Sequence, residues 1–208
     1  MKVARILYPV TVLGPGKRIA IWLAGCSKRC SGCANPELWD GENYPDMELQ
    51  NLIDALQMLY EKADEQVDGI TISGGEPFEQ AEELLALVSY LRKWTEDILI
   101  FSGKTYEELM QEETSANILD KIAVLVDGEY RESQNAGEVL RGSQNQTIYI
   151  LNEQIDEIYL SYQKEHQGKH LVENFRVNDG VIAVGIHKKD FQDELENVMK
   201  KKQIIRMR

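Results

Sequence analysis

Short apolar runs alternate with amphipathic stretches along the first three quarters of the chain. Five runs rich in Ile, Leu and Val have the length of buried strands: Arg18–Ala24, Gly69–Ser73, Ile98–Phe101, Ile122–Val126 and Thr147–Leu151. Three segments carry apolar residues at three- and four-residue spacing or start like a helix, and are predicted as helices: Met47–Ala63, Phe78–Lys93 and Thr105–Gln111. Asp46 directly precedes the first helix and is its expected N-cap.

This alternation of strands and helices predicts an α/β fold, with a parallel sheet and helical crossovers. The strands are almost continuously apolar, which is typical of a sheet that is covered on both faces. The repeats are too few for a closed eight-stranded barrel. We therefore expect an open partial (β/α)6-type barrel, and a doubly wound sheet is the alternative.

The pattern changes in the last quarter of the chain. Leu171–Val177 and Val181–His187 flank Asn178-Asp179-Gly180, which is a hairpin signal, and Asp190–Lys202 is predicted as a helix. We expect a core over residues 1–154 and a C-terminal α+β extension over residues 155–208, packed on the core. The extension either lines the opening through which a substrate enters or covers a sheet edge.

Charge and hydropathy exclude several classes of protein. The 208 residues include 35 acidic and 23 basic side chains, for a net charge of −12, which disfavours a general nucleic-acid binder. The exception is a small basic patch at the C-terminus: Lys200, Lys201, Lys202, Arg206 and Arg208. No apolar run is long enough to cross a bilayer and no signal peptide opens the chain, so we expect a cytoplasmic protein.

The cysteines give the first chemical signal. The chain has three, Cys26, Cys30 and Cys33, all in the loop after the strand Arg18–Ala24. Thiolates this close together favour zinc, copper(I) or an iron–sulfur cluster. A structural zinc site needs a fourth ligand, and the histidines that offer one lie in the tail: His166, His170 and His187. A Cys3His zinc site, a redox pair of Cys30 and Cys33, and a cubane with one open iron all remain possible.

A glycine-rich turn follows the next predicted strand. Ser73-Gly74-Gly75-Glu76-Pro77 stands at its carboxyl end, the edge at which parallel sheets bind ligands. Two glycines allow the backbone to approach a ligand closely. Taken alone, the segment is better explained as an ordinary strand-to-helix turn, because Gly-Gly turns are common.

Together these stretches resemble the radical S-adenosylmethionine enzymes, most closely the branch of the anaerobic ribonucleotide reductase activating enzyme. The resemblance extends over about residues 5–152. The motifs that carry it are Gly14-Pro15-Gly16, the loop from Gly25 to Asp40, Ser73–Pro77, Phe101-Ser102-Gly103 with Tyr106–Leu109, Val126-Asp127-Gly128, and Arg141–Gln146.

The resemblance implies roles for individual residues. Cys26, Cys30 and Cys33 would hold three irons of a [4Fe–4S] cluster, and the fourth iron would chelate S-adenosylmethionine. The backbone and carboxylate of the Gly74-Gly75-Glu76 segment would hold the methionine amino group. The other expected cofactor-binding residues are Asn35 and Pro77, which flank these motifs, Ser102 and Asp127, which would reach the ribose or methionine, and Asn145, whose loop would close over the cofactor.

The resemblance also implies a reaction. Reductive cleavage of S-adenosylmethionine gives a 5′-deoxyadenosyl radical that abstracts hydrogen, most simply from a glycyl-radical enzyme such as anaerobic ribonucleotide reductase. Flavodoxin or ferredoxin is the expected electron donor, and Lys28 and Arg29 or the C-terminal lysines are candidate docking groups for it. The alternatives are a maturase that acts on a peptide or small metabolite, and a non-catalytic iron–sulfur or zinc module.

Overall fold

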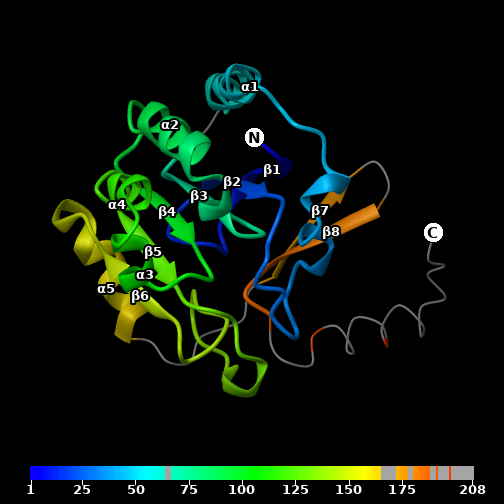
Figure 1. Cartoon of the computed structure of the whole chain (residues 1–208), viewed down its shortest axis with the longest axis vertical. Coiled ribbons are helices and arrows are strands. Elements are labelled where there is room, and N and C mark those ends of the chain that lie inside the picture. Colours follow the sequence, from blue (N-terminus) through cyan, green and yellow to red (C-terminus); the bar gives the residue numbers. More distant parts are fainter. Residues whose placement is uncertain (64–66, 165–171, 178–179, 188–190, 192–196, 198–208) are drawn as a thin grey trace.

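The computed structural model describes residues 1–63, 67–164, 172–177, 180–187, 191 and 197. Six strands form one sheet in the order of the sequence (Figure 1). They are β1 (Val3–Val10), β2 (Arg18–Leu23), β3 (Gly69–Gly74), β4 (Ile98–Phe101), β5 (Val124–Asp127) and β6 (Thr147–Ile150). The four central strands β2 to β5 are parallel, and β1 and β6 pair antiparallel to them at the two edges.

All five predicted strands are present, and four of them, β2 to β5, are parallel as expected, whereas the predicted strand Thr147–Leu151 forms the antiparallel β6. The strand order does not reverse anywhere, so the doubly wound alternative is wrong, because that fold needs a switch point. The structure adds β1, which the hydrophobic pattern did not predict. The open partial barrel stays a prediction, and the six observed strands form a mixed sheet rather than six successive parallel units.

Helices cover one face of the sheet (Figure 1). They are α1 (Leu49–Lys62), α2 (Ala81–Leu91), α3 (Tyr106–Met110) and α4 (Glu113–Leu119). The core on this face joins alternate strand residues such as Ile21 and Ile72 to Leu56 and Leu87 of the helices. Such alternation is expected because successive strand side chains point to opposite faces.

The helix boundaries follow local capping chemistry. The side chain of Thr105 accepts from the backbone N–H of Glu108, and the Glu108 side chain accepts from Thr105, which makes a capping box at the start of α3. By contrast, α1 begins at Leu49 after Glu48, with no side-chain cap. The predicted capping role of Asp46 is therefore wrong, since its backbone instead forms a bridge with Lys2.

The C-terminal extension covers part of the opposite face, together with loops of the core that supply Leu38 and Leu140. Its elements are α5 (Asp156–Lys164), which the sequence did not predict, and the strands β7 (Val172–Val177) and β8 (Gly180–Gly185). The two strands pair antiparallel, which confirms the predicted hairpin, although Asn178 and Asp179 of its turn lie outside the described residues. Val184 of β8 packs with Trp22 of β2. The predicted helix Asp190–Lys202, apart from residues 191 and 197, and the basic C-terminal patch also lie outside the described residues.

A buried charge network closes the amino end of the parallel strands. The guanidinium of Arg18, fully buried at the start of β2, donates to both carboxylate oxygens of Asp97 at 2.8 and 2.9 Å. Its Nε donates to Thr71 Oγ1 at 2.7 Å, and Nη1 donates to the carbonyl of Pro15 at 3.0 Å. From α5 of the extension, the hydroxyl of Tyr159 donates to Asp97 Oδ1 at 2.6 Å. The network therefore ties three parts of the chain together.

None of the helices in the described part of the chain is long and apolar enough to cross a membrane.

Candidate metal centre

The cysteine loop leaves the carboxyl end of β2 and is closed by its own backbone. The N–H of Gly25 donates to the carbonyl of Leu38 at 2.8 Å, and that of Cys26 donates to the carbonyl of Trp39 at 3.0 Å. Within the loop, the N–H of Cys33 donates to the carbonyl of Cys30 at 3.2 Å. The sequence thus encloses its three thiols in a turn that starts and ends beside the same strand.

The glycine-rich turn after β3 lies directly against this loop. The N–H of Gly75 donates to the carbonyl of Leu23 at 2.8 Å, and the N–H of Glu76 donates to the carbonyl of Gly25 at 2.7 Å. A Cβ built on Gly75 would lie 2.1 Å from the carbonyl oxygen of Gly25, so a larger residue would push the two turns apart. Gly-Gly is therefore explained by the close approach of two backbones.

These two turns share one cavity of about 320 Å³. The predicted site residues on its wall are Cys26, Cys30, Cys33, Asn35, Gly74, Gly75, Glu76 and Ser102. The structure therefore brings the thiols and the glycine-rich turn together, as the adjacency of parallel strand ends led us to expect. His187, which the sequence offered as a possible zinc ligand, also lines the cavity, and so do residues that sequence reasoning did not assign to the site: Trp39, Gly128, Tyr130, Gln146, Gly185, Ile186 and Phe191.

The three cysteines are free thiols and half-buried. Burial raises the pKa of each thiol, and nearby backbone N–H groups act in the opposite direction. One of these groups is the N–H of Asn35, which donates to Cys33 Sγ at 3.4 Å. Among the described residues no group of three His, Cys, Asp or Glu side chains is placed to hold a single metal ion. Three thiols on one cavity wall are nevertheless the donor type that an iron–sulfur cluster takes.

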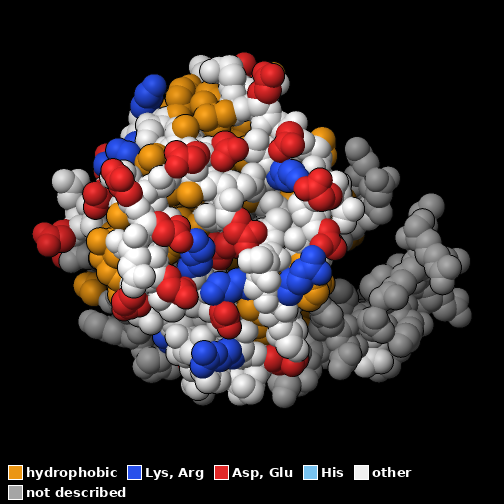
Figure 2. All heavy atoms as spheres, in the orientation of Figure 1, with side chains coloured by type: hydrophobic (Ala, Val, Ile, Leu, Met, Phe, Trp, Pro, Cys, Tyr) orange, Lys and Arg blue, Asp and Glu red, His pale blue; other side chains and the backbone are white. Residues whose placement is uncertain are grey.

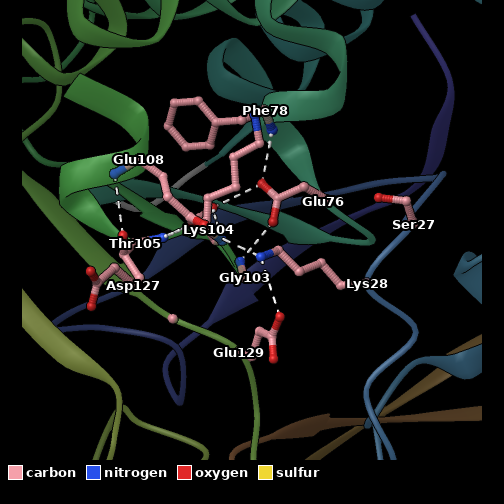
Figure 3. A network of polar contacts seen from close by, with 12 residues as sticks. Ser27, Lys28, Glu76, Phe78, Gly103, Lys104, Thr105, Glu108, Asp127 and Glu129 are labelled. Atoms are coloured by element: carbon pink, nitrogen blue, oxygen red, sulfur yellow. Dashed lines mark hydrogen bonds and ion pairs between the residues drawn. The ribbon is translucent and has the colours of Figure 1, made fainter. Parts of the chain in front are cut away.

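Glu76 is the most deeply buried carboxylate of the site, with 1% of its surface exposed. Its Oε1 accepts from the N–H of Phe78 at 3.1 Å and from the hydroxyl of Ser102 at 2.9 Å, and its Oε2 accepts from the N–H of Gly103 at 2.6 Å (Figure 3). Burial nevertheless raises its pKa. Among the described residues no Lys or Arg forms an ion pair with it.

Three predicted residues, Pro77, Asp127 and Asn145, are not among the described residues that line the cavity. Asp127, at the end of β5, accepts from the N–H groups of Tyr106 at 2.7 Å and Thr147 at 3.1 Å, so it joins α3 to β6. The side-chain amide of Asn145 donates to the carbonyl of Glu129 at 2.8 Å. Neither is among the described lining residues, whereas Gly128 and Gln146, next to them in sequence, are. Their predicted contacts with the cofactor therefore stay predictions.

Ser102 and Pro77 have structural partners of their own. The Ser102 hydroxyl, besides donating to Glu76, accepts from the N–H of Lys104 at 3.0 Å. Pro77 is buried at the first position of η3 (Pro77–Gln80), where it lacks only an N–H that the helix does not need. These two residues organise the ends of β4 and β3.

Lys28 and Arg29 do not form a positive patch. Lys28 Nζ lies 3.3 Å from Glu129 Oε1 and 3.9 Å from Glu108 Oε2, and Arg29 forms an ion pair with Asp40. Figure 2 shows Lys and Arg side chains interspersed with Asp and Glu on the face drawn. Both cations are thus largely compensated within the chain, which weakens their expected role in docking an acidic electron donor.

The extension reaches the cavity through the segment after β8. The side-chain amide of Asn135 donates to the carbonyl of His187 at 2.9 Å and to the hydroxyl of Tyr130 at 3.0 Å. The ring of His187 stacks on Phe191 at 4.1 Å between centroids. Its Nε2 is buried with no hydrogen-bond partner in the described structure, and burial lowers the pKa of the ring. The sequence gives no local signal for this placement, because it depends on the packing of the hairpin.

Comparisons with known proteins agree with this site. Residues 12–149 match the family described as a 4Fe-4S single cluster domain. The chain belongs to this family. It is 33% identical over 152 residues to an anaerobic ribonucleoside-triphosphate reductase-activating protein of Vibrio cholerae, covering 68% of this chain and 94% of that protein. Proteins of the same description from Enterobacteria phage T4 and Escherichia coli are each 30% identical, over 69% of this chain and 90% and 96% of their own lengths.

The family match bears directly on the cysteines. The chain has no cysteines other than Cys26, Cys30 and Cys33, and all three lie inside the matched range. The match therefore supports an iron–sulfur cluster at this loop rather than zinc or a redox pair. The relatives are covered almost to their full length by about two thirds of this chain, and the family match ends at residue 149. The extension that supplies His187 and Phe191 lies beyond that match.

Proposed function

We propose that this protein is a radical S-adenosylmethionine enzyme that generates a glycyl radical on an anaerobic ribonucleotide reductase. The observation that carries the proposal is the single cavity shared by three cysteines and the Gly74-Gly75-Glu76 turn. The names of the relatives, which are activating proteins of that reductase, support the choice of partner. A cytoplasmic location is part of the same proposal.

Glu76 supports the binding of a cationic ligand. A carboxylate offers about four acceptor positions, and the three donors found here leave one free on Oε2. A buried carboxylate without an ion-pair partner is costly, as its raised pKa indicates. The ammonium group of a bound S-adenosylmethionine would supply both the missing donor and the missing charge.

The chain's own part in the reaction is binding, orientation and exclusion of water. A reduced cluster bound there would supply the one electron needed to cleave the S–C5′ bond of S-adenosylmethionine to methionine and a 5′-deoxyadenosyl radical, which would take a hydrogen atom from the substrate. Cys26, Cys30 and Cys33 would hold the cluster. The backbone of Gly74 and Gly75 would lie against the methionine moiety, and Ser102 would fix the carboxylate of Glu76.

A second candidate function rests on the extension. Gly185, Ile186, His187 and Phe191 line the cavity although they lie outside the matched family range. A reshaped wall would suit a substrate other than a large reductase, such as a ribosomally made peptide or a small metabolite. In both cases flavodoxin or ferredoxin is the proposed electron donor.

The decisive experiment is anaerobic reconstitution followed by incubation with S-adenosylmethionine and dithionite. We expect about four irons per chain, as a [4Fe–4S] cluster requires, and formation of 5′-deoxyadenosine. Cys30→Ala should abolish both cluster formation and cleavage, because it removes one of three ligands. Cleavage by Cys30→Ala at the wild-type rate would overturn the assignment.

The substrate is tested in the same mixture. With anaerobic ribonucleotide reductase present, we expect an electron paramagnetic resonance doublet from a glycyl radical on the reductase. Deuterium transferred to 5′-deoxyadenosine from a labelled peptide or metabolite, with no doublet on the reductase, would favour the second candidate.

A further inference from the structure

A second, smaller cavity, the annex, adjoins the cavity that holds the cysteines. Its volume is about 120 Å³, and Asn35, Ser73 and His187 line both cavities. Most of its described wall is apolar and includes Leu13, Trp22, Phe101, Ile182, Val184 and Ile186. Because β8 and the residues after it lie beyond the family match, the extension of this chain forms one side of the annex.

Two nitrogens of residues in the annex wall are buried without a hydrogen-bond partner. They are Nε of Arg5 and Nε2 of His187, and neither is paired within the described structure. Buried polar groups in folded proteins are nearly always paired, since an unpaired one costs free energy. Two such groups around one small, mostly apolar cavity indicate a site for a ligand that hydrogen-bonds with both.

Other contacts hold both side chains in place. Arg5 Nη2 donates to Asn35 Oδ1 at 3.1 Å and to Glu37 Oε1 at 2.6 Å, and 17% of the Arg5 side chain is exposed. The ring of His187 stacks on Phe191, with 4.1 Å between the centroids. The two unpaired nitrogens therefore belong to side chains that are already fixed at the annex, not to the ends of exposed chains.

The chemistry of the two nitrogens favours an uncharged ligand with a carbonyl group. Arg5 Nε can only donate, whereas His187 Nε2 donates or accepts according to its tautomer. The positive charge of Arg5 is already paired with Glu37, so an anion would gain little there and would lose its hydration on entering an apolar cavity. A peptide group offers an acceptor oxygen to Arg5, and its oxygen or its N–H can satisfy either tautomer of His187.

We propose that the annex binds a main-chain peptide group of the protein segment whose glycine loses hydrogen, through Arg5 Nε and His187 Nε2. A glycine has no side chain to be recognised, so the main chain around it is what such a site can bind. Since the annex adjoins the cysteine cavity, a peptide group bound there would direct the substrate segment toward that cavity. The inference rests on the proposed function, because it takes a protein as the substrate, and it gives the extension a role in recognising that protein.

The test compares two small probes. N-acetylglycine N′-methylamide is uncharged and has two peptide groups, and in N-acetylglycine a carboxylate replaces one of them. Each is titrated into the anaerobically reconstituted protein, while nuclear magnetic resonance follows the Arg5 Nε–H group and the His187 ring. We expect the uncharged probe to shift both signals along one saturable curve and N-acetylglycine to bind about tenfold more weakly. The absence of a saturable shift at these two residues, or equal binding of the two probes, would overturn the inference.

Two variants remove the proposed contacts one at a time. Arg5→Lys keeps a cation for Glu37 but loses Nε–H, and His187→Phe keeps a ring against Phe191 but loses Nε2. Each should weaken binding of the uncharged probe by about three- to tenfold, the loss expected for one hydrogen bond, with the iron content unchanged. Arg176→Lys is the matched control and should match the wild type, since Arg176 is exposed on β7 and is not among the described lining residues. Wild-type affinity in both Arg5→Lys and His187→Phe would contradict the inference.

The same variants separate this inference from the proposed function. With the reductase as substrate, we expect both to raise KM more than kcat changes. If the wild-type protein binds the uncharged probe at Arg5 and His187 but forms no glycyl radical on the reductase, the proposed function fails and the peptide site stands. If the radical forms and both variants keep the wild-type KM, the inference fails and the proposed function stands.

Discussion

The two ends of the parallel strands differ in how far the protein satisfies its own polar groups. At the amino end, every nitrogen of the Arg18 guanidinium has an acceptor inside the chain. At the carboxyl end lie three free thiols, a buried carboxylate without an ion-pair partner and two buried ring nitrogens, of Trp39 and His187, without described partners. The amino end thus satisfies its polar groups within the chain, whereas the carboxyl end has polar groups that a bound ligand would satisfy.

The electrostatics of the amino end depend on all three members of its network. Burial acts to lower the pKa of Arg18, but the hydrogen bonds and charge of Asp97 and Tyr159 outweigh it, and the pKa is raised. Burial is also the main reason why the pKa of Tyr159 is raised well above its usual range. Arg18 therefore stays charged and Tyr159 stays neutral in this network.

The largest expected effect follows from breaking this network. Asp97→Ala leaves the fully buried Arg18 guanidinium without its counter-charge, which is expected to lower the free energy of unfolding by about 3–5 kcal/mol. Urea denaturation of the cluster-free protein measures this change. A loss below about 1 kcal/mol would mean that the amino end is not the stable end of the sheet.

A smaller loss is expected from the extension's side of the network. Tyr159→Phe removes a hydrogen bond to a buried carboxylate, and such bonds to charged groups contribute about 1.5–3 kcal/mol. Tyr90→Phe is the matched control, because its hydroxyl donates to Gln57 at an exposed site. If both variants lose the same free energy of unfolding, the hydrogen bond to the buried carboxylate of Asp97 contributes no more than an exposed one.

The third prediction concerns pH and the carboxyl end. The folded state raises the pKa of Glu76, so its contribution to stability is fully present below the unfolded pKa of about 4.3 and is lost as the pH rises through the folded pKa. Glu76→Gln should remove this decline, which unfolding curves between pH 4 and pH 7 would show.

Glu112 provides the opposite control. Its hydrogen bond with Lys104 lowers the pKa, so this contribution is present above the unfolded pKa and is lost as the pH falls. Glu112→Gln should therefore lower the free energy of unfolding near neutral pH and leave it unchanged at pH values below the unfolded pKa. The same pH profile in both variants would contradict the assigned difference between the two carboxylates.

The smallest effect is expected for the ion pairs of Lys28. They are partly exposed, and such pairs contribute at most about 1 kcal/mol, which salt screens. Lys28→Met should therefore change the free energy of unfolding by no more than this, and the difference should vanish in 1 M salt. A larger, salt-insensitive loss would show that the carboxyl end also contributes strongly to stability.

The sequence predicted the parts of the fold whose signals are local and strong. Strands such as Ile98–Phe101 are buried on both faces and therefore almost purely apolar. β1 was missed because it is a half-buried edge strand that contains Arg5 and Pro9, so its pattern is mixed. Glu113–Leu119 and Asp156–Lys164 are short helices whose apolar faces make sense only against a sheet that the sequence does not display.

The residues of the site also divide into those that the sequence placed correctly and those whose position depends on packing. The cysteines and Gly74-Gly75 follow consecutive strands, and adjacency of strand ends is enough to bring them together. Asp127 stands at a strand end as well, but its carboxylate turns to the N–H groups of Tyr106 and Thr147. The direction in which the Asp127 carboxylate points depends on the three-dimensional path of the chain and not on its position in the sequence. His187 reaches the cavity through the packing of a hairpin, which spacing along the sequence does not encode.

The hydroxyl of Tyr159 has a consequence for the modularity of the molecule. Tyr159 of the extension donates a hydrogen bond to the carboxylate of Asp97 in the core. The boundary near residue 154 therefore does not separate two independent units. A chain shortened to the length of its relatives would open both the Asp97 site and one face of the sheet. The extension, which lies beyond the family match, therefore contributes to the stability of the core through Tyr159.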